Sequence, residues 1–92
     1  MNDKINILLV DDHVVVRAGF RMLLATSEGM AVMAEASRGE QAIQLFDTLK
    51  PDIVVMDLSM PGIGGLETIR RLLQRDSEAL ILVFSVHHEQ VY

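Results

Sequence analysis

The sequence has no cysteine among its 92 residues, which excludes disulfide scaffolds and cysteine-ligated zinc sites. Its longest apolar run is six residues, 79–84, far short of the ~20 that a membrane helix requires. No basic segment followed by a long apolar one stands at the N-terminus, so no secretory signal is indicated. Basic residues are few, eight against thirteen acidic ones, and the net charge of −5 argues against nucleic-acid binding by this chain alone. These absences predict an acidic, soluble domain with a cytoplasmic location and no membrane partner.

Half of the residues are apolar and 23% are charged, which is typical of one small globular domain. Short apolar runs that predict strands alternate with segments that have the spacing of helices. The predicted strands span residues 5–10, 31–36, 53–56 and 79–84, and the predicted helices span residues 13–27, 38–49 and 66–75. This alternation predicts parallel βαβ units in an α/β, doubly wound sheet. With a strand order of 2-1-3-4, the fourth strand would be an exposed apolar edge.

Each predicted helix carries apolar side chains on one face. The residues expected to face inward are Val16, Phe20, Leu23 and Leu24 in the first helix, Ala42, Ile43, Phe46 and Leu49 in the second, and Leu66, Ile69, Leu72 and Leu73 in the third. Ser37 and Glu40 have the spacing of a capping box at the start of the second helix. Gly19 costs its helix ~1 kcal/mol relative to alanine, so we expect it to permit close packing of helix on sheet.

Acidic or hydroxyl side chains follow three of the four predicted strands. Asp11 and Asp12 follow the first, Asp57 ends the third, and Ser85 follows the fourth. Ligands of open α/β sheets bind at the carboxyl ends of the strands, and three carboxylates close together oppose one another's ionisation unless a cation neutralises them. Oxygen ligands of this kind favour Mg²⁺. The alternative, that each residue only caps the helix that follows it, is weaker for three carboxylates at one edge than for one.

Asp57 stands alone at the tip of a central strand, facing the Asp11–Asp12 pair, and is the best candidate for a nucleophile that forms an aspartyl phosphate. The Ser85 hydroxyl could hydrogen-bond a phosphoryl oxygen, or could equally cap the next helix. The histidines, His13, His87 and His88, do not share a metal-ligand spacing with a third ligand. We interpret them as loop or helix-start residues.

Three segments, residues 8–13 (LLVDDH), 54–62 (VVMDLSMPG) and 83–87 (VFSVH), resemble the receiver domain of two-component response regulators. The resemblance covers nearly the whole chain. Residues 11–13, 16–19 and 65–67 further resemble the subgroup whose output is a LuxR-type helix-turn-helix domain. The resemblance implies a flavodoxin-like sheet of order 2-1-3-4, a sensor histidine kinase as the phosphate donor, and DNA contact only through an output domain outside this chain. It also implies no enzymatic activity beyond assisting its own phosphorylation and dephosphorylation. A homodimer is expected on a different ground, because the exposed fourth strand at residues 79–84 would leave apolar area and backbone groups uncovered.

The resemblance also implies a role for each matched residue. Asp57 is the phosphoacceptor, and the Mg²⁺ ion is bound by Asp12 directly, by Asp11 through water, by Asp57 and by the backbone carbonyl of Ser59. Ser85 occupies the position of the switch hydroxyl that is drawn toward the phosphoryl group on activation.

The sequence departs from the receiver pattern at its C-terminal end. Receivers have a fifth strand ending in a lysine that pairs with the phosphoryl group, and then a fifth helix. Here the only lysines are Lys4 and Lys50, neither of which can replace it, so we expect residues 1–92 to be an incomplete receiver that is poorly phosphorylated by itself. Two alternatives stay open: an association module that cannot switch, and a Mg²⁺-dependent phosphatase with an Asp nucleophile. Haloacid dehalogenase-like phosphatases need a second Asp where this chain has Ser59, which speaks against the phosphatase.

Overall fold

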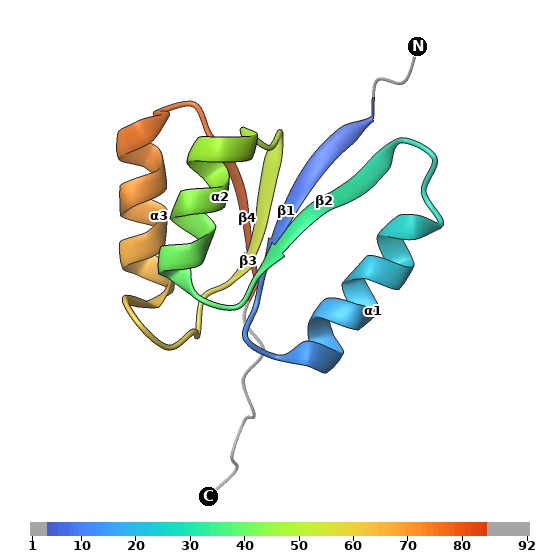
Figure 1. Cartoon of the computed structure of the whole chain (residues 1–92), viewed down its shortest axis with the longest axis horizontal. Coiled ribbons are helices and arrows are strands. Elements are labelled where there is room, and N and C mark those ends of the chain that lie inside the picture. Colours follow the sequence, from blue (N-terminus) through green and yellow to red (C-terminus); the bar gives the residue numbers. More distant parts are fainter. Residues whose placement is uncertain (1–3, 85–92) are drawn as a thin grey trace, which may run out of the picture.

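Strands and helices alternate along the whole of the described chain, residues 4–84 of the computed structural model (Figure 1). The strands are β1 (Ile5–Val10), β2 (Met30–Ala36), β3 (Ile53–Asp57) and β4 (Leu80–Phe84), and the helices are α1 (Val14–Ala25), α2 (Gly39–Leu49) and α3 (Gly64–Arg75). All seven predicted elements are present, and their bounds differ from the prediction by a few residues at the ends. Within residues 4–84 no helix is longer than 12 residues, and none is long and apolar enough to cross a membrane.

The four strands form one parallel sheet of order β2-β1-β3-β4, which confirms the predicted order. Val10 of β1 pairs with Met56 of β3, and Asp57 pairs with Phe84 of β4, so the carboxyl ends of three strands lie side by side. The pairing of β1 with β2 shifts by one residue between Ile7 and Leu8, which leaves Met33 as an extra residue in β2.

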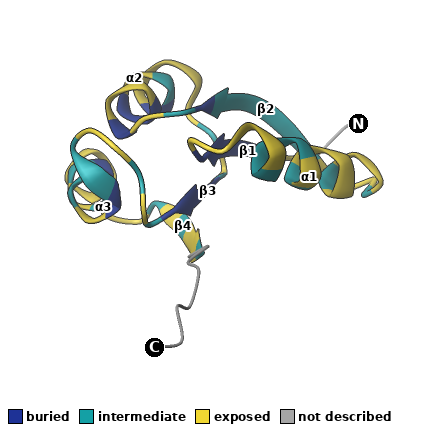
Figure 2. Ribbon diagram, turned by 90° about the horizontal axis from the view of Figure 1, so that it is seen from below, coloured by how far each residue is buried: buried dark blue, intermediate teal, exposed yellow. Residues whose placement is uncertain are grey.

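The helices cover the sheet unequally (Figure 2). Helices α2 and α3 lie on one face and enclose the larger core, made of Leu8, Val10, Ala36, Ala42, Ile43, Phe46, Val54, Met56 and Leu72. Helix α1 lies on the other face, where Phe20 and Leu24 pack against Ile7, Leu9 and Val55. Since this face has only one helix within the described chain, Leu80 and Leu82 of β4 are largely exposed.

Some residues expected to face inward do not. Leu23 in α1 and Leu66 in α3 are 70% and 73% exposed, and Leu49 and Leu73 lie near the surface. In α3 the inward position is taken by Thr68, which is fully buried and donates a hydrogen bond to the Gly64 carbonyl at 2.7 Å. An apolar stripe on a small domain is wider than the area that its neighbours can cover, so its margins stay in water.

The predicted capping box at the start of α2 is wrong. The helix begins at Gly39, its N-cap is Arg38 with no side-chain cap, and the Ser37 N–H donates to Gln41 Oε1 at 3.0 Å. The Glu40 carboxylate turns to its own N–H, to Arg38 and to the N–H of Ile63, and these contacts lower the pKa of Glu40. Glu40 therefore links the start of α2 to the loop before α3 instead of closing a box on Ser37.

Glycine has opposite roles in two helices. A Cβ on Gly65, in the first turn of α3, would lie 2.3 Å from the Leu58 carbonyl oxygen, so α3 packs directly on the backbone after β3. The expectation that Gly19 permits close packing is wrong, because no described atom lies within 4 Å of the Cβ that it lacks. Gly19 is exposed on α1 and makes no close approach to the sheet within residues 4–84.

We expect opposite effects from alanine at these two positions. Gly65→Ala should lower the free energy of unfolding by about 2 kcal/mol, since a backbone segment must shift to admit the methyl group. Gly19→Ala should raise it by about 0.5–1 kcal/mol, because a helix interior favours alanine where space is free. Urea unfolding of the two variants checks both signs. A Gly65→Ala protein as stable as the parent would contradict the close packing on Leu58.

Candidate phosphoryl and cation site

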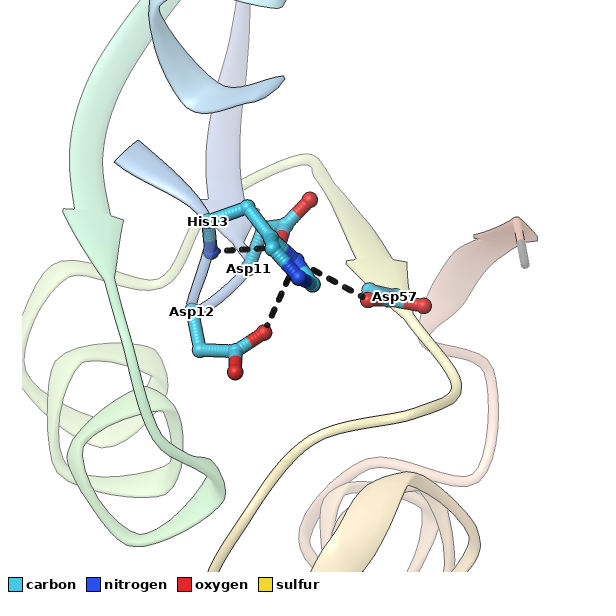
Figure 3. Close-up of side chains that lie close together, drawn as sticks. All are labelled: Asp11, Asp12, His13 and Asp57. Carbon is cyan, nitrogen blue, oxygen red and sulfur yellow. Dashed lines mark hydrogen bonds and ion pairs between the residues drawn. The ribbon is translucent and has the colours of Figure 1, made fainter. Parts of the chain in front are cut away.

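The pairing of β1 with β3 brings two buried carboxylates together at the carboxyl edge of the sheet (Figure 3). Asp11 follows β1 directly and its N–H donates to the Ala36 carbonyl at 2.9 Å, which extends the strand by one residue. Asp57 is the last residue of β3. Both side chains are fully buried. They sit beside each other, as predicted for neighbouring first and third strands, because parallel strands end at the same edge.

Each buried carboxylate has one oxygen held by the backbone and one without a partner. Asp11 Oδ1 accepts the His13 N–H at 2.8 Å, and Asp57 Oδ1 accepts the Ser59 N–H at 3.0 Å. Asp11 Oδ2 and Asp57 Oδ2 have no hydrogen-bond partner within residues 4–84. A buried anionic oxygen without a partner is costly, so these two atoms mark a place where a cation or a donor group would be stabilising.

Asp12 and His13 complete the cluster from its exposed side. The His13 Nδ1 lies 3.0 Å from Asp11 Oδ1, 3.1 Å from Asp12 Oδ1 and 3.9 Å from Asp57 Oδ2. The hydrogen bond to Asp11 and the charge of Asp12 raise the pKa of His13. The sequence interpretation of His13 as only a helix-start residue is therefore incomplete: it is the N-cap of α1, and its ring also lies among the carboxylates. The signal in the sequence for this second role is the position of His13 directly after two aspartates at the end of a strand.

Two arginine side chains bind groups that border the site, whereas the described lysines lie far from it. Arg17 donates to the backbone carbonyl of Asp11 and to Glu35 of β2 at 3.2 Å, and Arg21 also binds Glu35. Lys4 precedes β1, and Lys50, with a φ of 51°, ends α2 just before β3. Both lysines are therefore at the amino ends of the strands, as predicted, and cannot neutralise the carboxylates.

The loop after Asp57 is held against the start of α2. Gly62 has a φ of 82°, and a Cβ there would lie 2.7 Å from Glu40 Oε1 and 3.0 Å from Arg38 Nη2. This backbone conformation favours glycine, and the close approach of two side chains requires it. The loop that carries Ser59 is therefore anchored at Gly62 as well as at Asp57.

The donor set fits a small divalent cation. Asp11, Asp12, His13 and Asp57 each offer a ligand atom, and the four atoms lie within 4.8 Å of one another. Carboxylate oxygens of this number suit Mg²⁺, and the two unpartnered buried oxygens are the atoms that such an ion would satisfy. The Ser59 carbonyl as a ligand stays a prediction. Ser85, His87 and His88 lie outside the described residues.

Comparison with known proteins gives consistent matches. The profile of the response regulator receiver domain family matches residues 7–92. The chain is 48% identical over 85 residues to the response regulator UvrY of Escherichia coli and 45% identical over 85 residues to the nitrate/nitrite response regulator protein NarL of the same species. A two-component response regulator of the LuxR family from Aurantimonas sp. SI85-9A1 superposes with a TM-score of 0.87 at 47% identity.

The matches cover most of this chain and only part of each relative. They span 92% and 91% of the chain for UvrY and NarL, but 39% of the length of either. The match to the Aurantimonas structure covers 92% of this chain and 61% of the Aurantimonas chain.

Removing one buried charge should stabilise the protein when no divalent cation is present. Asp57→Asn keeps the acceptor for the Ser59 N–H and relieves the repulsion with Asp11, so we expect the free energy of unfolding to rise by roughly 1–2 kcal/mol. Urea unfolding in EDTA measures the change. Asp47→Asn, in an exposed pair with Arg75, is the control and should shift stability by less than about 0.5 kcal/mol. An unchanged or lower stability of Asp57→Asn would contradict this electrostatic account.

Proposed function

We propose, because this chain belongs to the response regulator receiver domain family, that Asp57 accepts a phosphoryl group from a sensor histidine kinase and that this switches an output. The observation that carries the proposal is the buried Asp57 Oδ2, which has no described partner at the tip of β3. It faces Asp11 and the Asp12–His13 pair, so its surroundings are anionic and favour a cation beside it.

The chemistry assigned to the residues is a single displacement. An oxygen of the Asp57 carboxylate attacks phosphorus, and a new P–O bond forms as the bond between phosphorus and the donor nitrogen or oxygen breaks. The Ser59 N–H, which donates to Oδ1 at 3.0 Å, holds the carboxylate in place. Asp12 is assigned as the direct ligand of Mg²⁺ and Asp11 as a ligand through water, with the Ser59 carbonyl as a further ligand. A cation held by these residues would neutralise the charge that the phosphoryl oxygens bring to the carboxylates.

Transcription regulation is assigned to a longer protein. Residues 1–92 span about two fifths of UvrY and NarL, which supports the proposal that they are a receiver domain continued by further receiver elements and by a DNA-binding output domain. In that protein Ser85 is assigned as the switch hydroxyl, and the cytoplasm, where histidine kinases present their phosphate, is its expected location.

Phosphorylation by a small acyl phosphate tests the assignment of Asp57. With Mg²⁺ present, intact-mass spectrometry should show one added phosphoryl group, and EDTA should prevent it. Labelling should be slow for residues 1–92 alone, since no described lysine reaches the site, and faster for the longer regulator. Asp57→Asn should abolish labelling in both, and Asp12→Ala should raise the Mg²⁺ requirement more than Asp11→Ala.

Asp47→Asn is the matched control, because Asp47 is an exposed carboxylate paired with Arg75 and should leave labelling unchanged. Labelling that persists in Asp57→Asn, or that proceeds equally well in EDTA, would overturn the assignment.

We also propose that copies of residues 1–92 pair through the uncovered side of β4. Leu80 and Leu82 are 62% and 61% exposed, beside an apolar hollow of about 460 Å³ that also includes Ile53 and Val55. The strand is the edge of the sheet, so its outer backbone groups have no described partner strand. Pairing would remove apolar area from water, which is favourable by ~25 cal/mol per Å². It would also give hydrogen-bond partners to the backbone N–H and C=O groups at the edge of the sheet.

Sedimentation velocity at several concentrations should show a monomer–dimer equilibrium for residues 1–92. Leu82→Glu should shift it to monomer, because it places a charge in the uncovered face. Leu66→Glu is the matched control: Leu66 is 73% exposed on α3, a helix on the face of the sheet opposite α1 and the hollow, and its replacement should leave association unchanged. A parent chain that stays monomeric, or equal effects of the two variants, would refute pairing through β4.

A further inference from the structure

The register shift in β2 decides which face of the sheet Glu35 occupies. Val32 packs in the core under α1, and strict alternation along a strand would turn Glu35, three residues later, toward α2 and α3. The extra residue at Met33 reverses the alternation, so Ala34 packs on the side of α2 and α3 and Glu35 faces α1. Bulges re-aim side chains in this way. The shift therefore presents a carboxylate to the arginines of α1.

Glu35 binds two arginines of α1 on this face. Its Oε1 accepts a hydrogen bond from Arg17 Nε at 3.2 Å, and its Oε2 accepts one from Arg21 Nη1. The side chains of Arg17 and Glu35 are only 19% and 24% exposed, so water and salt screen this pair less than a surface ion pair. Because both of its oxygens are bound, the Glu35 carboxylate holds the planar Arg17 guanidinium in one orientation.

The other end of this guanidinium reaches the backbone of the candidate site. Arg17 Nη1 donates to the carbonyl of Asp11, which belongs to the peptide group that joins Asp11 to Asp12. The N–H of Asp11 donates to the Ala36 carbonyl of β2 at 2.9 Å. Helix α1 and strand β2 thus fix the backbone on both sides of the Asp11 Cα. The directions of the Asp11 and Asp12 carboxylates depend on that backbone.

We propose that Arg17 is a positioning residue for phosphoryl transfer: it fixes the peptide between Asp11 and Asp12, and Glu35 in turn holds Arg17. This role rests on the proposed function and adds to it two residues that touch neither the cation nor the phosphoryl group. Its expected effect is opposite in sign to that of a charge acting through space. Removal of a nearby positive charge favours a bound cation by Coulomb's law, whereas loss of a bond that orients the ligands weakens cation binding.

Titration with Mg²⁺, followed by the amide shifts of the chain in NMR spectra, measures this effect. Arg17→Gln should raise the Mg²⁺ concentration at half-saturation about tenfold. Arg17→Lys keeps the charge without the planar fork and should raise it by about threefold. Arg21→Gln is the matched control, because Arg21 binds the same Glu35 from the same helix and makes no bond to Asp11. It should change the Mg²⁺ concentration by less than about twofold.

The amide nitrogen of Asp12 gives a second readout that needs no metal. It belongs to the peptide group whose carbonyl Arg17 binds, so its ¹⁵N shift responds to this hydrogen bond. In the absence of Mg²⁺ the shift should change in Arg17→Gln and stay constant in Arg21→Gln. Urea unfolding verifies that both variants are folded, and if Arg17→Gln is not, Arg17→Lys decides.

The outcomes separate this inference from the proposed function. If the parent chain binds Mg²⁺ and is labelled on Asp57, but Arg17→Gln binds Mg²⁺ as tightly or more tightly, the positioning role is wrong and the proposed function stands. Equal weakening in Arg17→Gln and Arg21→Gln would also overturn it, since loss of an ion pair to Glu35 would explain both. If the parent chain binds no Mg²⁺, the inference and the proposed cation site both fail.

Discussion

Two carboxylates, those of Asp11 and Asp57, are buried side by side at the end of a parallel sheet, and the rest of the structure is arranged around this constraint. Their repulsion opposes folding, and the apolar side chains just before them offset it. Leu9, Val10 and Met56 are almost completely buried, and each such side chain contributes ~1.5–3 kcal/mol of burial free energy. The strands thus hold charges together that water would separate, which leaves buried oxygen atoms available for a cation.

The loop after Asp57 follows from the same arrangement. The backbone must leave β3, carry Ser59 past the carboxylate and enter α3 within a few residues. Gly62 allows a left-handed turn against Glu40, and Gly65 brings α3 onto the Leu58 carbonyl. These contacts tie the loop to α2 on one side and to β3 on the other. The segment that follows Asp57 is therefore anchored at both ends.

The unequal cover of the sheet gives the domain two different faces. Two helices enclose the face that contains Leu8 and Val54, whereas among residues 4–84 α1 alone covers the other face and leaves much of β4 exposed (Figure 2). The carboxylate cluster lies at the edge common to both faces. The carboxylate cluster and the exposed strand are therefore adjacent, since Asp57 pairs directly with Phe84 of β4.

Local pattern determined most of this protein: the order and type of all seven elements, the parallel sheet, and the placement of Asp11, Asp12 and Asp57 at one edge follow from apolar runs that end in acidic residues. Tertiary structure decided what depends on neighbours distant in sequence. Leu23 and Leu66 stay exposed, because a helix face is buried only where a neighbouring element covers it. The Glu40 carboxylate lies against Gly62 instead of capping the helix start with Ser37. Tertiary structure also placed His13 in the cluster, since a ring's direction depends on carboxylates 46 residues apart that only strand pairing brings together.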